Sequence, residues 1–170
     1  MDGYMFELRE WNENDKDSIT YYANNKKIAD NLRNVFPNPY TEEHALFYIR
    51  MCLNESTPQK CVKAIVVDGK AVGSIGIFIK DDVYCKSAEL GYWLGEEFWG
   101  KGIMTEAIKE ICNYAFAKYD IVRIFAEPFA ENQGSRRVLE KAGFELEGIS
   151  KKSVFKNGKI SDSCIYAITR

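Results

Sequence analysis

The chain has 170 residues, which is enough for one domain with a sizeable core, and its 46% hydrophobic and 28% charged residues are typical of a globular protein. A formal net charge of −2 gives no general attraction to nucleic acid or to an anionic membrane surface. Five cysteines without a CxxC pair argue against a structural zinc site or a disulfide framework, and the only histidine, His44, excludes mechanisms that need two. We therefore expect one cytoplasmic domain over residues 1–170, with no metal, nucleic acid or membrane partner.

The beginning of the chain predicts a strand and two helices separated by a loop. Tyr4–Arg9 alternates apolar and charged residues, as a half-buried strand does. Asn14 is placed to cap a helix whose apolar residues recur at helical spacing. Residues 24–39 are polar and end in Pro37-Asn38-Pro39, which predicts a loop because proline disfavours helix at its own position and just before it. Thr41 then caps the second helix.

Three strands are predicted next. Cys61–Val67 and Ala71–Ile79 are strand-like and are joined by Asp68-Gly69, a strong signal for a two-residue hairpin. After a turn at Asp81-Asp82, the segment Ala88–Leu94 predicts the third strand.

A glycine-containing turn follows this third strand and opens the most periodic helix of the chain, Ile103 to about Lys118. Gly100 and Gly102 flank Lys101 in the turn. A ligand can approach glycine backbone closely, and the N-terminus of a helix offers unpaired N–H groups and a positive dipole end. We therefore predict a phosphate or pyrophosphate at residues 99–105, although a glycine pair also serves ordinary turns.

The remainder predicts a strand, a short helix and closing strands. The strand Ile121–Glu127 precedes a helix from Asn132 to Ala142, which Gly143 terminates. Three further strands are expected at Phe144–Ile149, Ser153–Lys156 and Ile160–Ile168, the last two joined by the hairpin turn Asn157-Gly158. An antiparallel meander followed by strand–helix crossings predicts a mixed α/β domain.

Two segments resemble the GNAT acyl-CoA N-acyltransferases. Trp99–Met104 is similar to that superfamily's (Q/R)-x-x-G-x-(G/A) pyrophosphate loop, and Asn132–Phe144 is similar to its N-x-x-S…EKxGF segment. Ala88–Leu94 and Asp162–Tyr166 resemble the branch that holds the ribosomal-protein N-terminal acetyltransferases. The resemblance implies a single α/β (α+β) GNAT domain. Its sheet would be mixed but mostly antiparallel, with six to seven strands, about four flanking helices and splayed central parallel strands.

The resemblance also implies a binding site for acetyl-CoA. Backbone groups of the third strand would pair with the pantetheine arm, the turn and first helical residues would surround the pyrophosphate, and one asparagine would bind the arm. The residues that this carries over are Trp93, Leu94, Trp99, Gly100, Lys101, Gly102, Ile103, Met104, Thr105, Asn132 and Ser135. The loop departs from the family pattern at Trp99 and Met104, and Met104 would narrow it if its side chain turned inward. The 3′-phosphate would meet the basic residues Arg136, Arg137 and Lys141, or these would form a solvated helix face.

Three residues are expected to carry the chemistry. Glu89, on a strand beside the presumed cleft, is the candidate general base; it would otherwise face solvent or pair with a lysine, with ordered water passing the proton. The Leu94 N–H is the candidate oxyanion donor. Many family members have a tyrosine where this chain has Leu139, so Ser135 is the candidate general acid; it would otherwise only cap or pack the short helix.

The resemblance implies an N-acetyltransferase that passes the acetyl group of acetyl-CoA to a primary amine by direct attack in a ternary complex. The acceptor would be a protein N-terminus or a small-molecule amine, and a homodimer is possible. The alternative is a non-catalytic acyl-CoA-binding module on the same fold. A dinucleotide-binding fold is disfavoured because only a GxG at residues 100–102 is present, after several strands.

Overall fold

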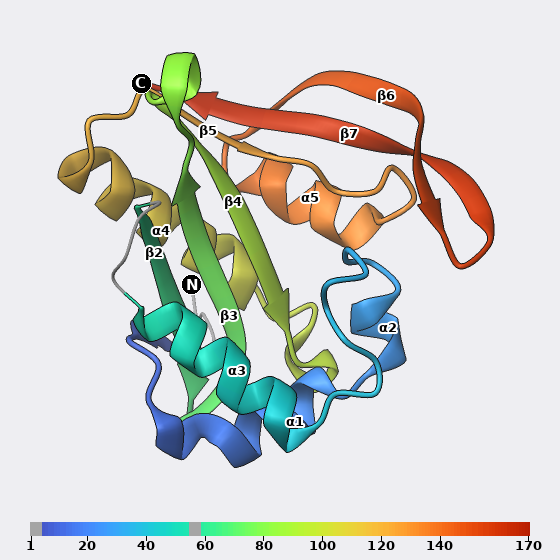
Figure 1. Ribbon diagram of the computed structural model, residues 1–170. Coiled ribbons are helices and arrows are strands. Elements are labelled where there is room, and N and C mark those ends of the chain that lie inside the picture. Colours follow the sequence, from blue (N-terminus) through green and yellow to red (C-terminus); the bar gives the residue numbers. More distant parts are fainter. Residues whose placement is uncertain (1–4, 55–58) are drawn as a thin grey trace.

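A computed structural model describes residues 5–54 and 59–170, so Tyr4 of the first predicted strand lies outside the described residues. The strands form one sheet of seven in the order β1-β2-β3-β4-β5-β7-β6 (Figure 1). They are β1 (Glu7–Arg9), β2 (Lys60–Val67), β3 (Lys70–Ile79), β4 (Ser87–Leu94), β5 (Arg123–Ala126), β6 (Glu145–Lys156) and β7 (Lys159–Thr169). The helices are α1 (Lys16–Ala23), α2 (Lys26–Ala29), α3 (Glu42–Leu53), α4 (Ile103–Lys118) and α5 (Gln133–Lys141). None of the described helices has the length and apolar character of a membrane span.

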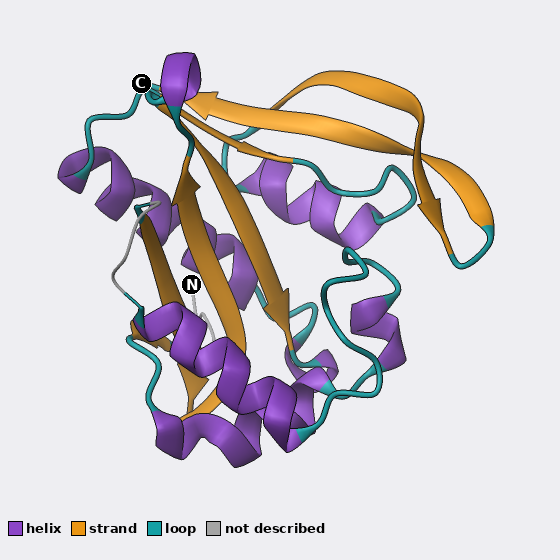
Figure 2. Ribbon diagram, in the orientation of Figure 1, coloured by secondary structure: helices purple, strands orange, loops and turns teal. Residues whose placement is uncertain are grey.

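Helices cover both faces of the sheet (Figure 2). On one face α1 and α3 pack against each other and against the β2–β3 hairpin, around a core that includes Trp11 and Trp93. On the other face α4 and α5 pack against the sheet and enclose the larger core. Successive residues of β4 alternate between these faces, because the side chains of a strand have a period of two: Trp93 belongs to the first core, Leu90 and Leu94 to the second.

The start of the chain departs from the sequence expectation in two places. The cap that was expected at Asn14 is at Asn12, whose side chain accepts a hydrogen bond from the Asn14 N–H (2.8 Å) at the head of the 3₁₀ turn Glu13–Asp15. The loop expected over residues 24–39 also contains the single-turn helix α2, capped by the Asn25 side chain. Local capping hydrogen bonds thus organise a stretch whose composition alone indicated a loop.

Asp15 ties this turn to β1. Its carboxylate accepts two hydrogen bonds from the Arg9 guanidinium (2.8 Å each) and one from the Asn12 N–H (3.0 Å). Burial by itself raises the pKa of Asp15, but these hydrogen bonds and the Arg9 charge outweigh it, so the pKa lies below its ordinary value. The stabilisation is therefore present above the unfolded pKa of about 3.9 and is lost as pH falls through the lower folded pKa.

We expect Asp15→Asn to lower the free energy of unfolding at pH 7 and to weaken the loss of stability that wild type shows below about pH 4. Urea unfolding across this pH range measures both effects. The exposed Asp17 is the matched control. An equal change in Asp17→Asn would contradict a specific contribution of the Arg9–Asp15 pair.

The second half follows the expected order with shorter or merged elements. Gly143 ends α5 with φ 96°, as expected. The two strands expected between residues 144 and 156 are one strand, β6, whose pairing with β7 shifts between Ser150 and Val154. Lys152 lies inside this irregularity with a left-handed φ of 56°. It belongs to the polar run 150–153, which interrupts the apolar alternation in the sequence and made one strand look like two.

The central strands separate partway along their length. β4 and β5 are the one parallel pair among the described strands, and their register covers only Ser87–Glu89 against Arg123–Phe125. β4 then continues to Leu94, while β5, which pairs with β7 along its whole length, diverges from β4 and ends at Ala126 (Figure 1). The expected splayed parallel strands are thus confirmed. We call the edge of β4 that β5 leaves uncovered, from Leu90 to Leu94, the strand gap.

Candidate active site

The strand gap opens into a cavity of about 1060 Å³. Its walls come from β3 and β4, the turn after β4, the start of α4, the end of β5 with α5, and α2 with the loop behind it. The predicted catalytic and acetyl-CoA-binding residues all line this cavity except Lys101. They are Glu89, Trp93, Leu94, Trp99, Gly100, Gly102, Ile103, Met104, Thr105, Asn132 and Ser135.

The turn before α4 has the geometry of an anion site. Gly100 and Gly102 have φ of 73° and 81°, a left-handed conformation that glycine adopts readily, and a Cβ built on either would meet nothing within 4 Å. The Glu106 N–H donates to Gly102 O (3.2 Å), the start of the helical bonding, so the N–H groups of residues 103–105 have no acceptor within the helix. The residues present therefore fit a pyrophosphate held by main-chain donors.

The two departures from the family loop are both accommodated. Met104 is 8% exposed, and its side chain packs with the core under α4 rather than filling the turn. The Trp99 indole Nε1 donates to the Leu94 carbonyl oxygen (2.7 Å). Trp99 thus fastens the turn to the end of β4.

Along β4 the backbone groups of successive residues point alternately towards β3 and towards the strand gap. The pairing with β3 decides which residues point which way. Gly73 lies opposite Leu94, and the Gly95 N–H donates to Val72 O (2.8 Å). This pattern makes Gly73 and Leu94 a non-hydrogen-bonded pair, so the Leu94 N–H points away from β3 and towards the strand gap. The backbone groups of Trp93, the residue before Leu94, point the other way. They pair with β3, which corrects the expectation that they would pair with the pantetheine arm.

The backbone groups of Tyr92, like those of Leu94, face the strand gap. The sequence analysis did not single out Tyr92 for the site. Its hydroxyl lies 2.5 Å from Ser135 Oγ, across the strand gap from β4 to α5. The Ser135 N–H in turn donates to Asn132 Oδ1 (3.2 Å), so Asn132 caps α5. One signal was available: Tyr92 alternates with Leu90 and Leu94, and a hydroxyl among such apolar residues requires a polar partner.

Glu89 lies in the cavity. It is also partly exposed to solvent and close to a lysine, the two alternatives to a catalytic role. Its carboxylate accepts a hydrogen bond from Arg33 (2.9 Å) and lies 3.8 Å from Lys80 Nζ. The Glu89 side chain is 20% exposed, whereas Arg33 reaches it from the loop after α2 with 69% exposure. A partly buried carboxylate held by two exposed cations can exchange them for the ammonium group of a substrate.

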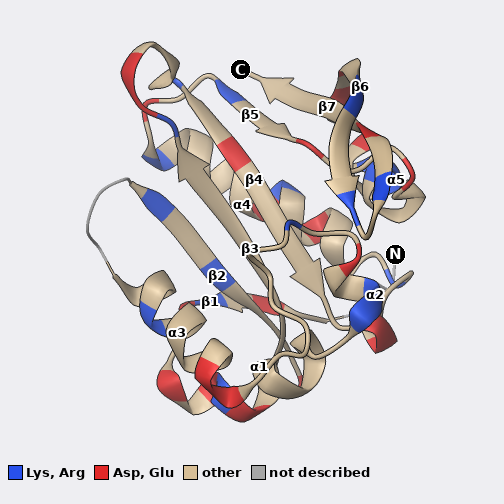
Figure 3. Cartoon of the chain, turned by 45° about the vertical axis from the view of Figure 1, so that its right-hand side comes forward, with Lys and Arg blue, Asp and Glu red and all other residues tan. Residues whose placement is uncertain are grey.

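Aromatic residues line the cavity on the face that Glu89 shares. The rings of Phe36 and Trp93 have centroids 6.0 Å apart, and Tyr48 OH lies 2.7 Å from Ser74 Oγ. The loop that carries Phe36 is held to the β6–β7 hairpin, because Lys156 Nζ donates to Leu32 O (2.7 Å). Figure 3 shows basic segments on α2, on α5 and on this hairpin, and acidic segments on α1 and α3.

Three basic residues of α5 had been considered for a 3′-phosphate. Arg136 donates to Ala130 O and to the Tyr166 hydroxyl (3.1 Å each), so it already has two structural partners. Arg137 and Lys141 line the cavity. They are therefore the two better placed to meet an anion.

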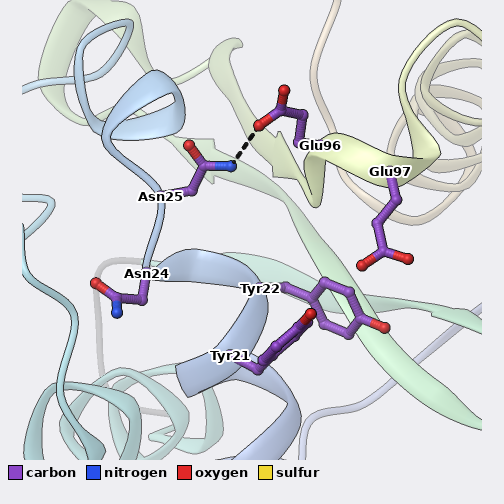
Figure 4. Close-up of a pocket in the computed structure, with 6 residues that line it drawn as sticks. All are labelled: Tyr21, Tyr22, Asn24, Asn25, Glu96 and Glu97. Carbon is purple, nitrogen blue, oxygen red and sulfur yellow. Dashed lines mark hydrogen bonds between the residues drawn. The ribbon is translucent and has the colours of Figure 1, made fainter.

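A second hollow of about 600 Å³ lies between the end of α1 and the 3₁₀ turn Glu96–Phe98 (Figure 4). Asn25 Nδ2 donates to Glu96 Oε1 across it (2.9 Å), and Tyr21 and Tyr22 form its floor. It contains none of the residues predicted for the site. Two carboxylates, Glu96 and Glu97, make it unsuitable for a phosphate.

Comparison with known proteins decides the family. The sequence model described as "Acetyltransferase (GNAT) domain" matches residues 6–145. The chain belongs to this GNAT family. The family resemblance and the fold expected from it are thereby confirmed.

Curated relatives and a solved structure agree with this GNAT membership. "Probable N-acetyltransferase YjcK" of Bacillus subtilis (strain 168) is 42% identical over 101 residues, 59% of this chain and 56% of that protein. "Ribosomal-protein-serine acetyltransferase" of Escherichia coli (strain K12) is 33% identical over 82 residues, 48% of this chain and 46% of that protein. The chain thus spans about half the length of the curated relatives it matches. "Mycobacterium smegmatis RimJ in complex with CoA-disulfide" shares the fold with a TM-score of 0.86 at 24% identity, covering 96% of this chain and 81% of that one.

Proposed function

We propose that this GNAT chain is an N-acetyltransferase that passes the acetyl group of acetyl-CoA to a primary amine in a ternary complex. One observation carries the proposal: a single cavity joins the left-handed glycine turn at the head of α4 to the strand gap between β4 and β5. The turn suits a diphosphate, and the gap suits an extended arm that pairs with strand backbone. The names of the relatives, which include N-acetyltransferases, support the same activity.

The residues of this chain would have separate roles in binding and in acetyl transfer. Acetyl-CoA, when bound, supplies an activated thioester carbonyl. The main chain of Gly100 to Thr105 would hold the diphosphate, and the backbone groups of Tyr92 and Leu94 that face the strand gap would orient the arm. The Leu94 N–H would donate to the oxygen that gains negative charge. Ser135 would hold a proton for the departing sulfur, and Asn132 would position Ser135 by capping α5.

Glu89 would receive the proton of the acceptor amine on the face of β4 that carries Trp93. The aromatic lining and the hairpin-bound loop favour an amine with an apolar neighbouring group. A protein N-terminus and a small-molecule amine both satisfy this chemistry. We also predict that the protein acts in the cytoplasm and can form a homodimer.

The test is binding followed by turnover. Calorimetric titration with CoA should show one site per chain, and acetyl-CoA with a panel of amines should release free thiol. The panel should contain peptides with different N-terminal residues, polyamines and arylalkyl amines. Failure to bind CoA would overturn the proposal. Tight CoA binding without turnover of any amine would instead support the alternative, a non-catalytic acyl-CoA-binding module.

A further inference from the structure

The contact between Tyr92 and Ser135 joins two elements that the strand gap otherwise separates. The two oxygens are 2.5 Å apart, and the residues are 43 positions apart in the chain. Tyr92 stands on β4 beyond Glu89, the last β4 residue paired with β5, and Ser135 stands in the first turn of α5. An arm that enters the strand gap must therefore pass next to this pair of hydroxyls.

The chemistry of the two hydroxyls favours one direction of the hydrogen bond. A phenol is a stronger acid, and hence a better donor, than an aliphatic alcohol, whose oxygen is the better acceptor. Burial raises the pKa of Tyr92, although the Ser135 hydroxyl opposes this shift, so the phenol stays protonated near neutral pH. Either hydroxyl can donate on geometry alone, and this difference in acidity assigns Tyr92 as the donor and Ser135 Oγ as the acceptor. The Ser135 hydrogen is then free to point into the strand gap.

We propose that Tyr92 is a positioning residue for acetyl transfer: it orients the Ser135 hydroxyl towards the thioester sulfur and strengthens it as a donor. The inference rests on the proposed function. A hydroxyl that accepts one hydrogen bond becomes a better donor in the next, because the chain of bonds polarises it. The phenol that many GNAT members supply from the short helix, where this chain has Leu139, is thus supplied from β4 in a supporting position.

The proposed step balances as follows. The amine nitrogen forms a bond to the acetyl carbon while Glu89 or water takes its proton, and the carbon–sulfur bond breaks with its electron pair on sulfur. Ser135 Oγ gives its proton to that sulfur. Ser135 Oγ then regains a proton from the Tyr92 hydroxyl or from solvent. Where Tyr92 gives the proton, solvent returns one to the phenol, which ends the cycle protonated as it began.

Tyr92→Phe, Ser135→Ala and the double variant form the test. We expect Tyr92→Phe to lower kcat about tenfold with an unchanged KM for acetyl-CoA, and Ser135→Ala to lower kcat at least as much. The double variant should match Ser135→Ala, because Tyr92 acts only through Ser135. Equal, independent losses that multiply in the double variant would overturn the proposal.

A binding measurement separates orientation of Ser135 from general packing. CoA should bind wild type more tightly than desulfo-CoA, which lacks the sulfur, and this ratio should fall at least threefold in Tyr92→Phe and approach unity in Ser135→Ala. An unchanged ratio in both variants refutes the inference even if acetyl transfer is real. A lowered ratio upholds it even if no acceptor amine is found.

Tyr166→Phe is the matched control. Tyr166 is a buried tyrosine whose hydroxyl, like that of the partly buried Tyr92, contacts α5, since it donates to Glu140 (2.8 Å), but it does not line the cavity. We expect a lower melting temperature and an unchanged kcat. Should Tyr92→Phe fail to fold, 3-fluorotyrosine at position 92 keeps the ring and the donor, and its kcat should equal or exceed that of wild type; a lower kcat would count against the proposal.

Discussion

Replacing Gly102 with alanine is expected to weaken CoA binding at least tenfold. Gly102 has φ 81° at the residue before α4, and its missing side chain leaves open space in the cavity wall. A methyl group would project into the volume that an anion must enter to reach the main-chain donors. The left-handed conformation itself would cost about 1–2 kcal/mol of folding free energy. Calorimetry measures the affinity, and thermal unfolding measures the stability.

Gly69 provides a closely matched control for this variant. It has φ 78° in the β2–β3 hairpin, a Cβ there would also meet nothing within 4 Å, and it lies outside the cavity. Gly69→Ala should therefore lose a similar amount of stability and keep full affinity for CoA. Equal affinities in Gly102→Ala and Gly69→Ala would show that the turn before α4 does not bind the diphosphate.

Features set by neighbouring residues were predictable from the sequence. The hairpin at Asp68-Gly69 and the stop at Gly143 depend on left-handed backbone conformations that only a few residue types favour, and the cap at Thr41 depends on a side-chain oxygen that accepts from the His44 N–H. The turn at Gly100 and Gly102 belongs to the same class. These local signals, taken in order, predicted a mixed α/β domain, and the motif resemblance to the GNAT family then specified the fold.

Contacts between distant segments were not predictable. The Tyr92–Ser135 hydrogen bond spans 43 residues and the Arg33–Glu89 ion pair spans 56, and no local pattern encodes either. The expectation for the Trp93 backbone failed for a related reason. A shift of one residue in the pairing of β4 with β3 would exchange the backbone groups that face the strand gap for those that face β3. This pairing is set by the partner strand and not by the sequence of β4 alone.

Glu89→Gln is expected to lower kcat/KM for the acceptor amine about 100-fold, or about 2.7 kcal/mol of transition-state stabilisation. The amide keeps the shape of the side chain and still reaches Arg33, but it cannot take a proton. Glu147→Gln is the matched control, because Glu147 also accepts from an arginine, Arg123 (2.8 Å), outside the cavity. It should leave kcat/KM unchanged. Steady-state rates at saturating acetyl-CoA measure both variants.

Arg33→Ala distinguishes a base from a structural tie. If Glu89 serves mainly to hold the loop after α2 through the Arg33 contact, removing either partner should cost the same rate. If Glu89 accepts the proton of the amine, Arg33 competes with the substrate for the carboxylate, and Arg33→Ala should leave kcat within a few-fold of wild type. The ion pair spans exposed and half-buried groups, so its own contribution to stability is small, about 1 kcal/mol or less. A 100-fold loss confined to Glu89→Gln therefore cannot arise from the broken pair, whereas parallel losses in both variants would remove Glu89 from the chemistry.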